Sequence, residues 1–66
     1  MNYKPVKAVT LRNNDKFIDV DGIITVTNIK LNFLEDIVEF TGHNLTTGYA
    51  AKRWIAMDRL VNKVTS

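Results

Sequence analysis

Alternating apolar and polar residues along the chain predict short β-strands. Over residues 23–30, Ile24 and Val26 fall on one face of an extended segment, while Thr25 and Thr27 fall on the other. This spacing of two is typical of a strand that packs one face on a core and leaves the other in solvent. The pattern therefore predicts a half-buried strand here, with Ile24 and Val26 facing inward.

Three further segments predict strands of the same kind. Residues 6–11 are rich in β-branched side chains, residues 16–20 form the next strand, and residues 36–41 place Val38 and Phe40 on one face. Asn and Asp residues separate the first two segments, where their side chains favour a turn. Together the four segments predict an antiparallel sheet.

The dipeptide Asp21-Gly22 is the clearest turn signal in the chain. A two-residue hairpin turn of type I′ needs positive φ at both central residues, and Asp-Gly adopts it readily. Pro5 fits the first residue of an edge strand, where its missing N–H breaks no hydrogen bond. We expect the residues before it, up to Lys4, to fray.

The last third of the chain allows two predictions. Five apolar residues recur at helical spacing and would line one face of a helix over about residues 50–64: Ala50, Trp54, Met57, Val61 and Val64. The alternative is a strand over residues 49–55, a tight turn over 56–60 and a short last strand over 61–64. The helix gives an α+β fold, a four-stranded antiparallel sheet with a C-terminal helix, and the strands give an all-β fold.

Six short motifs, taken together, favour the all-β fold. They are Val9-Thr10-Leu11-Arg12, Asn14-Asp15-Lys16-Phe17, Val20-Asp21-Gly22, Thr25-Val26-Thr27-Asn28-Ile29, Val38-Glu39-Phe40-Thr41-Gly42 and Thr46-Thr47-Gly48. Their order resembles small SH3-like barrels over about residues 8–64. Such barrels occur in the N-terminal domain of translation elongation factor P, in KOW modules of transcription and ribosomal proteins, and in many short phage-encoded proteins.

The resemblance implies a single domain over residues 1–66 with an all-β fold, a small five-stranded SH3-like barrel. In such barrels the sheet closes on itself, the first and last strands lie side by side, and a tight turn precedes the last strand. No particular activity follows from it. Loop 42–48 lacks the basic residue that elongation factor P presents at a loop tip, and the glycine spacing of a KOW module is absent.

Charge is divided along the chain, although its net value is only +2. Residues 1–16 carry a net charge of +3, residues 17–48 of −4 and residues 49–66 of +3. If the fold brings the two ends together, their basic side chains meet on one side of the molecule. That arrangement predicts a nucleic acid, DNA or RNA, or an acidic protein surface as the partner.

Two absences narrow the class of protein further. The chain has no cysteine, which excludes disulfides and thiolate metal sites and fits a reducing compartment. No apolar run has the length of a membrane span or of a signal-peptide core. We therefore expect a cytoplasmic location and no membrane partner.

Catalytic chemistry finds no support in the sequence. His43 is the single histidine and Ser66 the single serine. The chain therefore lacks the set of ligands that a transition-metal site needs and offers no usual nucleophile–base pair. A glycine-rich phosphate loop is also missing. We expect a protein that is not an enzyme, has no cofactor and takes no small-molecule substrate.

Basic and aromatic residues near the end of the chain carry the functional prediction. Basic side chains neutralise phosphates, and an exposed aromatic ring can stack on an unpaired base. The residues expected to bind nucleic acid or another partner are Tyr49, Lys52, Arg53, Trp54, Arg59 and Lys63, joined by Lys7 and Arg12. We expect a small phage-encoded module that binds nucleic acid or serves transcription or translation. The competing role for Trp54, the single tryptophan of a small domain, is a core residue.

A second hypothesis places the protein in a different class. It is a protein-interaction module, or an inhibitor, that docks on a host protein. Its contact would be the edge of the sheet or an apolar surface that includes Leu31, Phe33 and Leu34.

Overall fold

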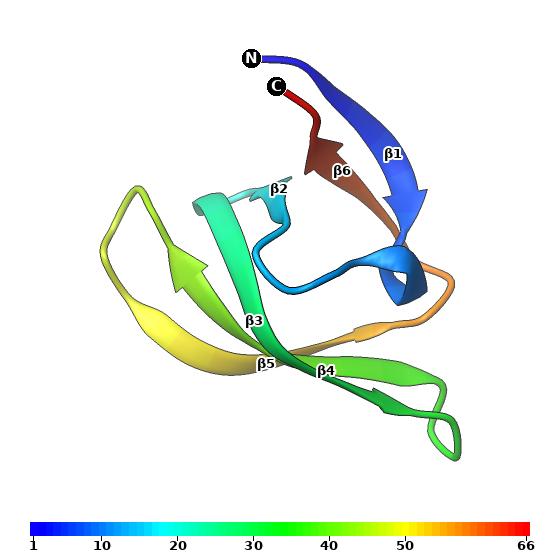
Figure 1. Cartoon of the computed structure of the whole chain (residues 1–66). Coiled ribbons are helices and arrows are strands. Elements are labelled where there is room, and N and C mark those ends of the chain that lie inside the picture. The colour runs from blue at the N-terminus through cyan, green and yellow to red at the C-terminus, as the bar shows by residue number, and fades with distance from the viewer.

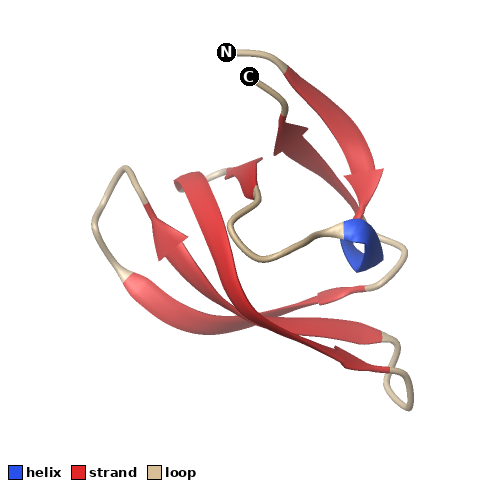
Figure 2. Ribbon diagram, in the orientation of Figure 1, coloured by secondary structure: helices blue, strands red, loops and turns tan.

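The computed structural model describes residues 1–66 and confirms an all-β fold (Figures 1 and 2). Its elements are β1 (Tyr3–Lys7), the 3-10 helix η1 (Ala8–Thr10), β2 (Lys16–Asp19), β3 (Gly22–Asn32), β4 (Ile37–Asn44), β5 (Ala50–Ala56) and β6 (Leu60–Val64). The helix is a single turn, and the chain contains no helix that is long and apolar enough to cross a membrane.

All six strands form one antiparallel sheet in the order β1-β6-β2-β3-β4-β5. The first and last strands lie side by side, as predicted, and the two chain ends are close together (Figure 1). The sheet has six strands rather than the predicted five. Its edge strands, β1 and β5, do not pair with each other, so the sheet stays open.

The sheet folds over on itself, so that its β3-β4-β5 half packs against its β1-β6-β2 half (Figure 1). Ten buried apolar residues fill the space between the halves: Ala8, Leu11, Phe17, Ile24, Val26, Val38, Phe40, Ile55, Met57 and Val61. Phe17 and Phe40 meet edge to face across this core, with ring centroids 6.0 Å apart. The predicted inward faces of the strands around Val26 and Val38 are thus confirmed.

A bulge bends β3. Its register with β4 shifts between Thr27 and Lys30, and Asn28 adopts a positive φ of 54° there. The Ile29 N–H donates to the side-chain oxygen of Asn13, which ties the bulge to the turn before β2. Bulges increase the bend and twist of a strand, and this one re-aims the outward side chains of the bent half-sheet.

The predicted hairpin between β2 and β3 is confirmed, but its turn differs from the predicted one. Asp19 pairs with Gly22, so Val20 and Asp21 are the two loop residues. Within residues 19–22 only Gly22 carries a positive φ, of 136°, and a type I′ turn on Asp21-Gly22 is therefore wrong. The glycine is needed at the first residue of β3, where a Cβ would collide with the Thr46 hydroxyl.

Residues 50–64 form β5, a turn and β6, which confirms the favoured prediction of two strands and rules out the alternative C-terminal helix. β5 pairs with β4 along its whole length, from Ala50 opposite His43 to Ala56 opposite Ile37. The helical spacing of the five apolar residues in this segment indicated a buried helix face, but only some of these residues are buried. Trp54, which a helix would have turned toward the core, is 69% exposed.

The N-terminal strand begins and ends earlier than predicted. β1 starts at Tyr3 and pairs with β6 from that residue onward, so Tyr3 and Lys4, which we expected to fray, lie in a paired strand. The predicted strand over residues 6–11 turns into η1 after Lys7. This turn carries Ala8 and Leu11 into the core, which an extended strand along β6 would not do.

Candidate functional site

The two faces of β5 carry different chemistry. Successive side chains of a strand point to opposite faces, so Lys52 and Trp54 share the outer face and Arg53 points inward. Lys52 and Trp54 are exposed, whereas Arg53 is half-buried. The three residues that the sequence grouped as one contact surface are therefore separated by the sheet.

Lys52 and Trp54 line a hollow of about 470 Å³ on the outer side of the β3-β4-β5 half, which we call the outer groove. The other residues whose side chains belong to this face are Asn28, Lys30, Glu39 and Thr41. The groove is open and lined mainly by polar residues, with the large indole ring of Trp54 exposed among them.

Strand register explains why these residues meet. Glu39 of β4 lies opposite Lys30 of β3 on one side and opposite Trp54 of β5 on the other. Cross-strand neighbours on one face have Cβ atoms about 5 Å apart, so these three side chains form a row. Thr41, two residues further along β4, lies opposite Lys52 and starts the next row. Only the first row holds both charges and the aromatic ring.

The charges of the outer groove are free of partners within the molecule. The chain forms three ion pairs, and neither Lys30 nor Lys52 takes part in one. The half-buried Glu39 carboxylate likewise makes no ion pair and no side-chain hydrogen bond. The groove therefore presents two ammonium groups, one carboxylate and one exposed indole, all available to a ligand.

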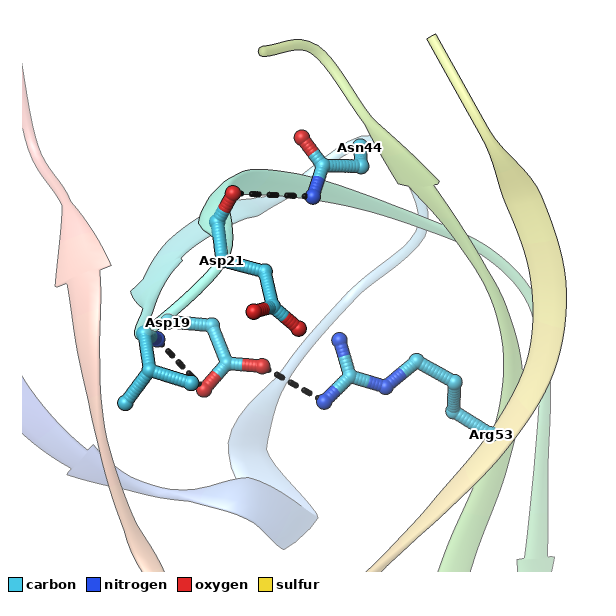
Figure 3. Close-up of polar contacts among 5 residues, drawn as sticks. Asp19, Asp21, Asn44 and Arg53 are labelled. Carbon is cyan, nitrogen blue, oxygen red and sulfur yellow. Dashed lines mark hydrogen bonds and ion pairs between the residues drawn. The ribbon is translucent and has the colours of Figure 1, made fainter. Parts of the chain in front are cut away.

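Arg53 instead closes an ion pair across the interior side of the open sheet (Figure 3). Its Nη2 donates to Asp19 Oδ2 of β2 at 2.6 Å, and its guanidinium lies 5.8 Å from the centre of the Phe17 ring. The side chains of Arg53 and Asp19 are only 32% and 13% exposed. This contact links β5 to β2, which are not neighbours in the sheet.

The environment of Asp19 holds the pKa of its carboxyl below the ordinary value. Burial opposes ionisation, but the hydrogen bond from Arg53, the bond that the Val20 N–H donates to Oδ1 at 2.9 Å, and the charges of Arg53 and Arg59 outweigh it. Asp19 is consequently ionised at neutral pH, and Arg53 is neutralised by it. The ion pair gives Arg53 a structural contact, and its role in partner binding stays a prediction.

The remaining basic residues lie on the β1-β6 side of the molecule. Lys4 pairs in register with Lys63, while Lys7 lies near Arg59 because the Ala8 N–H donates to the Arg59 carbonyl at 2.8 Å. The predicted meeting of the two chain ends is confirmed at this point.

Two of these cations have acidic neighbours. Lys63 lies 3.5 Å from Asp15, and Lys7 lies 4.0 Å from the exposed Asp58. Lys52 does not join this basic group, because it lines the outer groove, which contains no residue of β1 or β6. Arg53 does approach Arg59, since both line one hollow beside Asp19. Arg12 and Arg59 are exposed and make no ion pair.

Two other predicted contact regions lie outside the outer groove. Tyr49 is 79% exposed in the loop before β5. Phe33 and Leu34 are 70% and 99% exposed in the turn between β3 and β4, and Leu31 precedes them on β3. None of these four residues lines the outer groove.

Sequence reasoning missed four members of the outer groove: Asn28, Lys30, Glu39 and Thr41. Lys30 and Glu39 both lie within residues 17–48, and the net charge of −4 over that segment does not indicate that they face one groove. The signal for Lys52 and Trp54 was present in their spacing of two, which places them on one face of a strand. No comparable signal identified Lys30, because the bulge at Asn28 changes which residues of β3 face outward.

These features define a small all-β protein with an open, folded sheet and one polar, aromatic-bearing groove on its outer face. No group of three or more histidine and acidic side chains is placed to hold a metal ion. No protein-family model matches the chain, and no curated protein matches it.

Proposed function

We propose that the protein is a non-enzymatic module that binds single-stranded nucleic acid in the outer groove. The observation that carries the proposal is the 69% exposure of Trp54 on the face that also carries the unpaired Lys30 and Lys52. A large exposed aromatic ring is poorly hydrated, and a stacked base would cover it. The ammonium groups of Lys30 and Lys52 lie on the same face, where they can contact the nucleotide and its phosphates.

A single strand suits this surface better than a duplex. Stacking on an aromatic side chain requires an unpaired base and contributes about 1–3 kcal/mol per base. One or two lysine–phosphate contacts release few counterions, so the logarithm of affinity should fall against the logarithm of salt concentration with a slope of only about −0.7 to −1.4. We expect weak sequence-independent binding that is strongest at low salt.

The architecture supports a wider proposal about the class of protein. β1 lies beside β6, a tight turn precedes β6, and the sheet is strongly bent, as in SH3-like barrels. We propose that the fold is an open relative of these barrels. A cytoplasmic, phage-encoded role in transcription or translation is the setting that fits it.

Fluorescence anisotropy with a labelled hexathymidylate and a labelled hexauridylate tests the binding proposal. Trp54→Ala should weaken binding about tenfold or more, because the stacking surface is lost. Phe33→Ala removes an equally exposed aromatic ring outside the groove and should leave binding unchanged.

A second matched pair tests the charges. Lys52→Gln should weaken binding and flatten its salt dependence, whereas Lys4→Gln, with the same change in net charge but on β1, should do neither. Absence of binding to either oligonucleotide at low salt would overturn the proposal. Equal effects of Lys4→Gln and Lys52→Gln would show attraction by net charge alone.

Docking on a protein is the competing function, and the exposed Phe33 and Leu34 are the observation that favours it. A docking function predicts that the protein does not bind oligonucleotides and that a pull-down retains a protein partner after nuclease treatment. Loss of that partner in Leu34→Ser, with its retention in Trp54→Ala, would assign the function to the β3-β4 turn.

A further inference from the structure

We infer that the outer groove prefers guanine as the base stacked on Trp54, with Glu39 and Lys30 reading its Watson–Crick edge. This inference rests on the proposed binding of single-stranded nucleic acid. It follows from the row Lys30, Glu39 and Trp54, in which a hydrogen-bond donor and an acceptor lie side by side next to the stacking ring.

The carboxylate in this row is the unexpected feature. A groove that served only to neutralise phosphates would not hold an anion at its centre, because the anion repels them. Glu39 forms no ion pair inside the protein, so its carboxylate is free to accept hydrogen bonds from a ligand. A ligand that donates hydrogen bonds to Glu39 would supply the missing partner.

An ionised carboxylate accepts hydrogen bonds and donates none. The base beside it must therefore present N–H groups. Guanine presents two adjacent ones, N1–H and the 2-amino group, which match the two oxygens of a carboxylate in the bidentate manner that Arg adopts. Guanine O6 lies next to N1–H and is an acceptor, to which the Lys30 ammonium can donate a hydrogen bond.

The other bases match this donor–acceptor pair less well. Thymine and uracil offer one N–H beside a carbonyl and can satisfy only one carboxylate oxygen. Adenine and cytosine offer an amino group beside an unprotonated ring nitrogen, whose lone pair would face the carboxylate. The expected order is guanine first, thymine or uracil next, and adenine and cytosine last.

Lys52 is left to contact phosphate in this arrangement. It lies two residues from Trp54 on the same face of β5, in the row of Thr41 rather than that of Glu39. One row of the sheet thus contacts the phosphate backbone of the nucleic acid, and the other row recognises the base. Loss of Lys52 should weaken binding of every sequence, whereas loss of Glu39 should change the ranking of bases.

Fluorescence anisotropy of labelled hexanucleotides tests the inference. The probes are hexathymidylate and three variants with one central guanine, inosine or cytosine. The guanine probe should bind about tenfold more tightly than hexathymidylate, within the range of one good bidentate contact. Inosine keeps O6 and N1–H but lacks the 2-amino group, so its probe should bind about as hexathymidylate does.

The variant Glu39→Gln should abolish the guanine preference and leave hexathymidylate binding intact or slightly stronger, because a repulsive charge is gone. Glu35→Gln is the matched control, since it removes the same charge from the exposed β3-β4 turn. Equal binding of all four probes to the unmodified protein, abolished by Trp54→Ala, would overturn the guanine inference and leave the proposed function standing. Failure of all four probes to bind would overturn both.

Discussion

The ion pair between Arg53 and Asp19 should be a main source of stability, because it spans strands that share no backbone hydrogen bonds. In the variant Arg53→Met the side-chain stem is kept and the guanidinium is lost. Asp19, whose side chain is only 13% exposed, then loses its partner. The contact between β5 and β2 would lose its polar link.

The expected loss of stability in Arg53→Met follows from the contacts that Arg53 makes. A hydrogen bond of 2.6 Å between charged groups contributes about 1.5–3 kcal/mol, and the guanidinium above the Phe17 ring adds about 0.5 kcal/mol. Because Arg53 remains one-third exposed, solvent screens part of this. We expect a loss of about 2 kcal/mol, which lowers the midpoint of thermal unfolding by about 10 °C in a domain of this size.

Thermal and urea unfolding of a double-mutant cycle provide the assay. Arg53→Met, Asp19→Asn and the double variant should show a coupling free energy of about 1–2 kcal/mol. The control is Asp58→Asn, which breaks the pair of Lys7 and Asp58, 4.0 Å apart and largely exposed, and should cost less than about 0.5 kcal/mol. A coupling near zero, or an equal effect of Asp58→Asn, would refute the reasoning.

The pH dependence of the same variants gives an independent check. The pKa of Asp19 is lower in the folded protein than its ordinary value of 3.8, so its ionised form favours folding. The difference in the free energy of unfolding between the unmodified protein and Asp19→Asn should be fully present well above pH 3.8. It should vanish as pH falls through the lower pKa of the folded state. An advantage that grows toward acid pH would contradict the assigned direction.

Three further predictions concern the core, the hairpin and the exposed ring. Leu11→Ala opens a void at a site that is 2% exposed and should cost about 3 kcal/mol in urea unfolding, enough to leave much of so small a domain unfolded. Gly22→Ala should destabilise the fold by more than Gly48→Ala, because a Cβ at Gly22 meets Thr46 whereas one at Gly48 meets open space; equal losses would refute this. The emission of Trp54 should be red-shifted and readily quenched by acrylamide, and a blue-shifted, protected emission would place the ring in a core.

Much of the fold could be predicted because several local signals agreed. The alternation around Val26 and Val38 identified core faces, and Asp21-Gly22 located a hairpin even though the turn type differed. The choice between helix and strand over residues 50–64 could not be made from periodicity, since Trp54 satisfies the helical stripe but is exposed. Pairing with β4, a tertiary effect, decides that choice.

The candidate site was predicted only in part, for a physical reason. Adjacent residues in a strand point to opposite faces, so Arg53 could not act together with Lys52 and Trp54 once β5 formed. Lys30 reaches the same face only through strand register and the bulge at Asn28, which depend on distant parts of the chain. The distribution of charge along the sequence cannot show that Lys30 lies on the same face as Lys52 and Trp54.

The most direct test of the central claim is a titration of the isotope-labelled protein with a single-stranded hexanucleotide, followed by ¹H–¹⁵N correlation spectra at low salt. We predict that the largest shift changes fall on the Trp54 indole N–H and on the backbone amides of Lys30, Glu39 and Lys52, across β3, β4 and β5. Changes centred on Lys4 and Lys7 in β1, or no changes at all, would contradict the account.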